Sequence, residues 1–234
     1  MQRKRHHLII GFILSICLLL LAGCRAILPT IEILLQQQAQ APSEMAANPS
    51  TVTQPDLPAA WIGRMELGDP EAPIVVEAYE DFLCPHCRDW TDTVESQLMA
   101  QYIQAGTVRL VFHNFPLQGF APGSHMAAMA SQCAADQGLF WPYHDYLFAA
   151  QSSGQAGFMR ESLSDYAKQV GADTTLFDSC LASLEHQEAI QQSVQEGIDR
   201  GVTGTPAVFV NGAQVANGFD EIQTAIEGLL AEEQ

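Results

Sequence analysis

The pattern of apolar and polar positions predicts five short strands, three in the first half of the chain and two near its end. Runs rich in β-branched and aromatic residues are typical of strands, as are runs that alternate apolar with polar side chains. These runs are Ile62–Leu67, Ile74–Tyr79, Thr107–Asn114, Ala207–Val210 and Gln214–Ala216. Asn211-Gly212, between the last two runs, is a dipeptide typical of a tight two-residue hairpin.

Helical spacing of apolar positions predicts one helix from about Pro85 to Gln104, which Gly106 ends, and a final helix over Phe219–Ala231. Between the two groups of strands, the same spacing predicts a block of helices at 123–136, 139–150, 158–170, 174–184 and 186–200. The sequence therefore predicts an α/β domain that a helical insertion, at about residues 119–200, divides into two parts.

The N-terminal part of the chain follows a different pattern. A basic region, Met1–His7, precedes an apolar run without charges, Leu8–Ala22. The run is shorter than the roughly 20 residues that a membrane-spanning helix needs, and it is typical of a signal peptide. We therefore predict a signal peptide over residues 1–23, a polar, proline-containing flexible tether over 24–60, and the folded domain over 61–234.

The residues Leu21-Ala22-Gly23-Cys24 resemble the lipobox of bacterial lipoproteins. That resemblance implies cleavage before Cys24, lipidation of Cys24, and attachment of the protein to a membrane through this lipid anchor. The alternative is an uncleaved N-terminal signal anchor in which Cys24 has no role. Both interpretations give an extracytoplasmic, membrane-anchored domain.

Composition restricts the class of partner. The chain of 234 residues is 47% hydrophobic and 16% charged, which is typical of a globular protein. Its formal net charge is −17, and its only basic cluster, Arg3 to Arg5, lies in the predicted leader. We predict no nucleic-acid binding, because a phosphate backbone requires a basic surface.

The candidate chemistry lies in Cys84-Pro85-His86-Cys87, between the strand at 74–79 and the following helix. A cysteine at a helix N-terminus has a lowered pKa, because unpaired amides and the helix dipole stabilise its thiolate. Pro85 suits the first helical position, and His86 can add a charge or a hydrogen bond beside the sulfur. We predict a redox-active Cys84–Cys87 disulfide with no other cofactor. Cys84 would be the attacked sulfur, and Cys87 would resolve mixed disulfides.

A cysteine pair of this spacing can also be half of a zinc site or a structural crosslink. The chain has no second such pair, and no two histidines after the leader stand at zinc-binding spacing. A crosslink within so short a ring restricts little chain entropy. We therefore predict no metal site and favour redox chemistry.

Four segments together resemble the DsbA-like branch of the thioredoxin superfamily, particularly its exported single-domain bacterial forms, over about residues 72–230. The segments are Cys84-Pro85-His86-Cys87, Phe115-Pro116-Leu117, Gly138-Leu139-Phe140-Trp141, and Gly201-Val202-Thr203-Gly204-Thr205-Pro206 before the Asn211-Gly212 hairpin. The resemblance implies a thioredoxin fold with an inserted helical subdomain. It also implies a cis Thr205–Pro206 peptide, with Pro206 facing Cys84.

The Pro-His dipeptide is the one found in strongly oxidising members of this branch. The resemblance therefore implies a dithiol oxidase that introduces disulfides into unfolded or reduced exported proteins. A membrane quinone-linked reoxidase of the DsbB or VKOR type would then restore its disulfide. Isomerising relatives dimerise through an extra N-terminal domain; residues 25–60 are too short and too polar for one, and we expect a monomer.

The sequence departs from the family at one position. Relatives usually carry a buried acid six residues before the first cysteine, where this chain has Ala78. Strand alternation predicts that the neighbouring Glu77 points to the opposite face. Glu80 and Asp81 lie closer to the motif and are possible substitutes, and a bulge could instead bring Glu77 to the cysteine side. Glu80 and Glu77 are therefore the candidate proton-relay residues.

Cys133 and Cys180 both fall on predicted helices of the insertion. In an oxidising compartment we expect a structural disulfide between them, the alternatives being a bridge that tunes the redox centre and two buried thiols. His113, His125 and His144 are interpreted as structural or surface residues. Phe82 and Leu83 would form an apolar rim for unfolded substrates.

Two alternative functions remain open at this point. The first is a disulfide reductase or isomerase on the same fold. The second is a non-catalytic lipoprotein that uses the fold as a binding module, for which Cys84 would have an ordinary thiol pKa.

Overall fold

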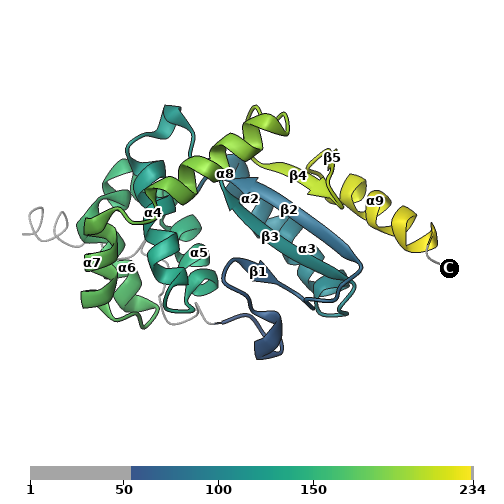
Figure 1. Ribbon diagram of the computed structural model, residues 1–234, viewed down its shortest axis with the longest axis horizontal. Coiled ribbons are helices and arrows are strands. Elements are labelled where there is room, and N and C mark those ends of the chain that lie inside the picture. The colour runs from purple at the N-terminus through teal and green to yellow at the C-terminus, as the bar shows by residue number, and fades with distance from the viewer. Residues whose placement is uncertain (1–53, 233–234) are drawn as a thin grey trace, which may run out of the picture. The chain divides into compact units, whose positions relative to one another are not determined.

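The computed structural model of the protein describes residues 54–232 (Figure 1). The predicted signal peptide, Cys24 and nearly all of the predicted tether lie outside the described residues. Within the described part, no helix is both long and apolar enough to cross a membrane.

A five-stranded mixed sheet forms the centre of the described domain, in the order β1-β3-β2-β4-β5. The strands are β1 (Glu66–Leu67), β2 (Ile74–Glu80), β3 (Val108–Asn114), β4 (Ala207–Val210) and β5 (Ala213–Val215). β2 and β3 run parallel, and the other neighbours are antiparallel. Asn211 and Gly212 turn the last hairpin with φ of 44° and 81°, the left-handed values that its two-residue turn requires.

The predicted strand at Ile62–Leu67 is wrong over most of its length. Only Glu66–Leu67 pairs with β3, and Ile62 makes a single bridge to Leu67. The chain folds back here, since the Gly63 amide donates to the Glu66 carbonyl over 2.9 Å. The local turn therefore leaves only two residues free to join the sheet.

The helix that follows β2 extends over the predicted range, but it is not a regular α-helix throughout. It consists of α2 (Pro85–Trp90), the π-helical η3 (Thr91–Glu95), α3 (Ser96–Leu98) and the π-helical η4 (Met99–Ile103). Gly106 ends it with φ of 75°, and a Cβ at Gly106 would lie 2.9 Å from the Trp61 ring. Glycine is therefore required at this position for both backbone and steric reasons.

Helices occupy the chain between β3 and β4, as predicted. They are α4 (Gly123–Ala135), α5 (Phe140–Ala149), the 3-10 helical η6 (Ala150–Phe158), α6 (Arg160–Gln169), α7 (Thr174–Ser183) and α8 (Gln187–Asp199). Two short 3-10 turns, η2 (Ala59–Trp61) and η5 (Gln118–Phe120), and the final helix α9 (Phe219–Glu232) complete the described part. Cys133 on α4 and Cys180 on α7 form a disulfide.

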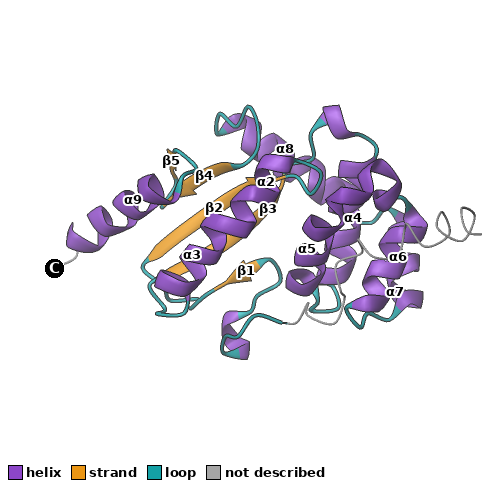
Figure 2. Ribbon diagram, turned by 180° about the vertical axis from the view of Figure 1, so that it is seen from behind, coloured by secondary structure: helices purple, strands orange, loops and turns teal. Residues whose placement is uncertain are grey.

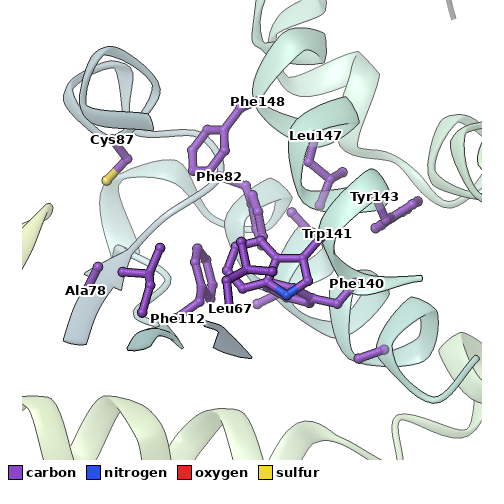
Figure 3. Packing of buried hydrophobic residues seen from close by; sticks show 14 of the residues in the cluster. Leu67, Ala78, Phe82, Cys87, Phe112, Phe140, Trp141, Tyr143, Leu147 and Phe148 are labelled. Atoms are coloured by element: carbon purple, nitrogen blue, oxygen red, sulfur yellow. The ribbon is translucent and has the colours of Figure 1, made fainter. Parts of the chain in front are cut away.

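The two faces of the sheet carry different helices, as Figures 1 and 2 show. α2 and α3 cover one face and α8 covers the other. β2 alternates accordingly, because Val76 and Ala78 belong to the main core, whereas Tyr79 packs with Phe115 and Phe209 in a second cluster. In Figure 3, Phe82 and Phe112 lie between the strand that carries Ala78 and helix α5.

Candidate active site

The end of β2 delivers Cys84 directly to a helix N-terminus. Cys84 has extended backbone angles and is the N-cap of α2, and Pro85 occupies the first helical turn. The Cys84 amide donates to the Asp81 carbonyl, and its own carbonyl accepts from the Cys87 and Arg88 amides. Both Cys84 and Cys87 are free thiols in this structure.

Cys84 faces the loop before β4. Its side chain is buried, and its Sγ lies 3.5 Å from the Thr205 carbonyl oxygen, across 121 residues of sequence. The peptide bond between Thr205 and Pro206 is cis. The structure thus brings together the two motifs that stand furthest apart in the sequence resemblance.

Several donors surround the Cys84 sulfur and lower its pKa to about 5. The largest effect is a hydrogen bond from the Cys87 thiol, and the Thr205 hydroxyl and the amides of Cys87 and His86 add to it. Burial opposes these donors but does not outweigh them. Cys84 is therefore a thiolate at neutral pH.

The pKa of Cys87 is shifted in the opposite direction, upward. Cys87 is fully buried, and burial first and then the Cys84 sulfur raise the pKa of Cys87, as would Glu80 whenever that carboxyl is ionised. The Asp81 amide, 3.5 Å from the Cys87 sulfur, opposes this rise only weakly. The reduced pair thus holds one negative charge on Cys84 and one proton on Cys87.

Glu80 lies at the end of β2 and is 1% exposed. Neither of its carboxylate oxygens has a hydrogen-bond partner among the described residues. Burial raises the pKa of Glu80 well above its usual value, and the charge of Cys84 raises it further, whereas the Thr91 hydroxyl lowers it. A carboxylic acid therefore stands next to the cysteine pair on the same face as Ala78.

Glu77 lies on the other face of the sheet. Its oxygens accept from Arg200 at 2.7 and 2.8 Å, and His113 Nε2 is 3.2 Å away. These partners, His113 first, lower the pKa of Glu77 to about 2. Arg200 in turn lies over the Phe209 ring at 3.9 Å. Glu77 is thus held by Arg200 and His113 and is not a neighbour of Cys87.

Two polar side chains hold the loop before Cys84: Asp81, a possible substitute acid by sequence, and Gln151, which no motif singles out. Asp81 accepts from the Leu83 and Leu117 amides, both at 2.8 Å, and from the Ser124 hydroxyl. Gln151, from η6, donates to the carbonyls of Phe82 at 2.8 Å and of Cys84 at 3.0 Å. Nothing in the sequence near Gln151 indicates this contact, which depends on how the insertion folds back.

The predicted apolar rim is wrong for Phe82. Its side chain is 1% exposed and stacks on Phe112 with ring centroids 5.2 Å apart. It therefore belongs to the core and cannot receive a substrate. Leu83 is half-buried.

An open pocket of about 360 Å³ lies beside the cysteines. It is lined by His86, Asp89, Trp90, Thr93, Val94, Thr205, Pro206 and Asn217. His86 thus faces the pocket from the α2 side and Pro206 from the loop side. The pocket therefore lies between the first turn of the helix that Cys84 begins and the Thr205–Pro206 loop.

Comparison with known proteins agrees with this geometry. A family model described as "Thioredoxin" matches residues 62–228. The chain is 32% identical over 171 residues to the "Probable disulfide bond formation protein D" of Bacillus anthracis, covering 72% of this chain and 79% of that protein. It is also 37% identical over 145 residues to the Na(+)/H(+) antiporter NhaA 3 of Salinispora tropica, of which it covers only 21%. Among solved structures, oxidised BdbD from Bacillus subtilis has a TM-score of 0.65 at 24% identity, over 71% of this chain and 92% of that one.

Proposed function

Because this chain belongs to the DsbA-like protein-disulfide oxidoreductases of the thioredoxin superfamily, we propose that it works as a dithiol oxidase. Its Cys84–Cys87 disulfide oxidises the thiols of reduced or unfolded exported proteins and is itself reduced. The observation that carries this direction is the contrast between a stabilised thiolate at Cys84 and a buried thiol at Cys87. A disulfide whose reduced form is stabilised in this way is a strong oxidant.

The transfer proceeds by two thiol-disulfide exchanges. A substrate thiolate attacks the Cys84 sulfur, the Cys84–Cys87 bond breaks, and Cys87 leaves with the electron pair. A second substrate thiolate then attacks the substrate sulfur of the mixed disulfide, and Cys84 leaves as a thiolate. The substrate loses two electrons and gains a disulfide, and the cysteine pair of the enzyme gains the two electrons. The low pKa of Cys84 favours the second step, because a thiol of low pKa is the better leaving group.

We assign the proton supply for Cys87 to Glu80 and not to Glu77. A thiolate on buried Cys87 is costly, so the leaving sulfur must receive a proton. The Glu80 carboxyl lies on the Cys87 side of the sheet and is held in its acid form by burial. Glu77 lies on the opposite face, and its ion pairs keep it ionised.

Substrates would enter at the open pocket between His86 and Pro206. An extended peptide there can pair with backbone groups of the Thr205–Pro206 loop, which gives affinity without strong sequence preference. His86 supplies a polar edge next to the sulfur under attack.

A redox titration tests whether the protein works as an oxidase or as a reductase. Equilibration with glutathione should give a potential near about −120 mV, and a value near about −270 mV would support a reductase or isomerase instead. Cys84→Ser should abolish oxidation of a reduced model protein, and a fully active Cys84→Ser variant would point to a binding module. The Cys133→Ala/Cys180→Ala variant is the control, because its redox centre is unchanged.

We further propose that the domain is monomeric, that it is held outside the cytoplasmic membrane through a lipidated Cys24, and that a quinone-linked reoxidase of the DsbB or VKOR type restores its disulfide. Cys87→Ala should accumulate mixed disulfides in cells with both substrates and reoxidase. Labelled fatty acid should be incorporated by the wild type and not by Cys24→Ser. A wild type that incorporates no label and keeps its leader would instead indicate the uncleaved signal anchor.

A further inference from the structure

A buried polar cluster lies behind the two cysteines. It consists of Glu80 at the end of β2, Glu95 in η3 and His144 in α5, and one ligating atom of each lies within 4.8 Å of the others. Both Glu80 oxygens, Glu95 Oε2 and His144 Nε2 lack a hydrogen-bond partner among the described residues. Each such group costs about 1–3 kcal/mol when it is buried unpaired, so the cluster needs a functional explanation.

The inner end of the cluster reaches the redox centre along one helix face. Cys87, Thr91 and Glu95 are spaced four residues apart, which places them on one face of the helix that Cys84 begins. The Thr91 hydroxyl is also buried with no hydrogen-bond partner within 3.5 Å among residues 54–232, and it lies close enough to Glu80 to lower the pKa of that carboxyl. Glu80 is therefore bordered by the cysteine pair on one side and by Glu95 on the other.

The outer end reaches solvent through α5. His144 Nε2 is 3.9 Å from Glu95 Oε2, and its Nδ1 is 2.9 Å from Asp145 Oδ1. The His144 side chain is 0% exposed, whereas that of Asp145 is 51% exposed. His144 thus connects an interior carboxyl to a carboxylate at the surface.

Aromatic rings seal the sides of this connection. Five rings surround His144 with centroids between 4.8 and 5.8 Å away; they belong to Phe82, Phe112, Phe140, Trp141 and Phe148. In Figure 3 these rings fill the space between β2 and α5. Polar exchange with solvent is therefore directed along the line of polar groups.

We propose that Glu95 and His144 form the outer half of a proton path that joins Glu80 to Asp145 at the surface. The proposal rests on the proposed function, in which Glu80 protonates Cys87. When the disulfide is reduced, Glu80 gives its proton to the Cys87 thiolate and takes one from Glu95, which takes one from His144. The substrate dithiol loses two protons to solvent, and one of them returns along this path to Cys87. Reoxidation runs the path in reverse.

The charges of the cluster suit such exchange near neutral pH. Burial raises the pKa of Glu95 to about 8, with Glu80, Asp145 and Asp92 adding to the rise and His144 opposing it. Burial alone would lower the pKa of His144, but Glu95 and Asp145 raise it. Both groups can therefore hold a proton and release it.

A divalent cation is the competing occupant, because two carboxylates and an imidazole are metal ligands. With bonds of about 2.0–2.2 Å, ligand atoms stand about 3.0–3.5 Å apart. Here the His144 Nε2–Glu95 Oε2 separation is 3.9 Å, which is longer than that range. The geometry favours proton exchange.

Stopped-flow reduction of the disulfide by a dithiol peptide, followed from pH 5.5 to 8.5 in H₂O and D₂O, tests the proposal. Glu95→Gln and His144→Gln should slow the reduction by at least about tenfold at the alkaline end, where protons are scarce, and should enlarge the solvent isotope effect. Glu95→Asp should recover most of the rate. The redox potential and the Cys84 thiolate absorbance should change little, which separates proton supply from a loss of structure.

Asp145→Asn changes an exposed side chain, so it keeps the test decisive if the buried variants fail to fold. It should shift the alkaline limb of the pH profile toward lower pH. Glu71→Gln and His125→Gln, outside the cluster, are the matched controls. An unchanged profile in Asp145→Asn, and in Glu95→Gln where that variant folds, would overturn the path while leaving the oxidase intact. A wild-type protein that does not oxidise the peptide would overturn the proposed function itself. One equivalent of a divalent metal in the purified protein, lost in Glu95→Gln, would assign the cluster to a metal and refute the proton path.

Discussion

Acidification should remove a stabilising contribution that depends on the Cys84 thiolate. The pKa of Cys84 in the folded dithiol form is about 5, whereas an unfolded thiol titrates near about 8.5. Because the folded pKa is the lower one, the thiolate stabilises the folded state fully above the unfolded pKa. This contribution is lost as the pH falls through 5.

The two pKa values set the size of the effect. At pH 7 the unfolded thiol is almost entirely protonated, so about two pH units separate the solution from the folded pKa, which corresponds to about 2.7 kcal/mol. The contribution approaches about 4.8 kcal/mol above pH 8.5 and falls below about 0.1 kcal/mol at pH 4. In a two-electron couple, the value at pH 7 makes the disulfide more oxidising by about 60 mV.

The assay is equilibrium urea unfolding of wild type and Cys84→Ser at several pH values between 4 and 7, both in a phosphine reductant. Cys84→Ser has no thiolate but shares the other carboxyl groups and the same reduced Cys133 and Cys180. The difference in unfolding free energy between the two proteins should therefore shrink by about 2.7 kcal/mol from pH 7 to pH 4. A difference that stays constant within about 0.5 kcal/mol would refute the stabilised thiolate and, with it, the argument for an oxidase.

Three further predictions concern the rest of the described domain. Glu77→Gln should lower the unfolding free energy by about 2–3 kcal/mol at neutral pH. This loss should fade as the pH falls toward 2, where wild-type Glu77 also becomes protonated. The redox potential should stay constant, and a shifted potential would contradict the position of Glu77 on the face away from the cysteines. Cys133→Ala/Cys180→Ala should cost about 3–4 kcal/mol in urea unfolding because the bridge closes a loop of 47 residues, and oxidation of a model substrate should persist. Gly197→Ala should destabilise by about 1–3 kcal/mol, since its Cβ would lie 2.7 Å from the Phe115 ring; Gly228→Ala, which meets open space, should instead gain up to about 1 kcal/mol.

Local pattern was sufficient for most elements of the fold. β-branched runs and the Asn211-Gly212 turn identify β2, β3, β4 and their hairpin, because these choices depend on neighbours in sequence. The error at Ile62–Leu67 has a different origin, since the backbone there pairs with itself before it reaches the sheet. The 3-10 helix η6 was not predicted either, because its glycines and serines give no periodic signal.

The candidate site likewise contains residues that the local sequence pattern predicts and residues that it does not predict. Cys84 and Cys87 follow from a motif, and strand alternation already predicts that Glu77 points away from them. No local pattern indicates that Glu95 and His144 meet, because they come from separate helices whose packing brings them together. The sequence around His144 is typical of a structural histidine, whereas in the described part of the chain its Nε2 is buried with no hydrogen-bond partner.

The 121-residue separation between Cys84 and Thr205 affects how the chain matures. Contacts between such distant positions form late, because a long loop must close first. During synthesis, all four cysteines of the described part emerge before Thr205 does, and four thiols can pair in three ways. Until β4 docks beside β2, Cys84 lacks the Thr205 hydroxyl that helps lower its pKa. The Cys84 sulfur therefore reaches its full thiolate character only when the fold is complete, after Cys133 and Cys180 have both emerged.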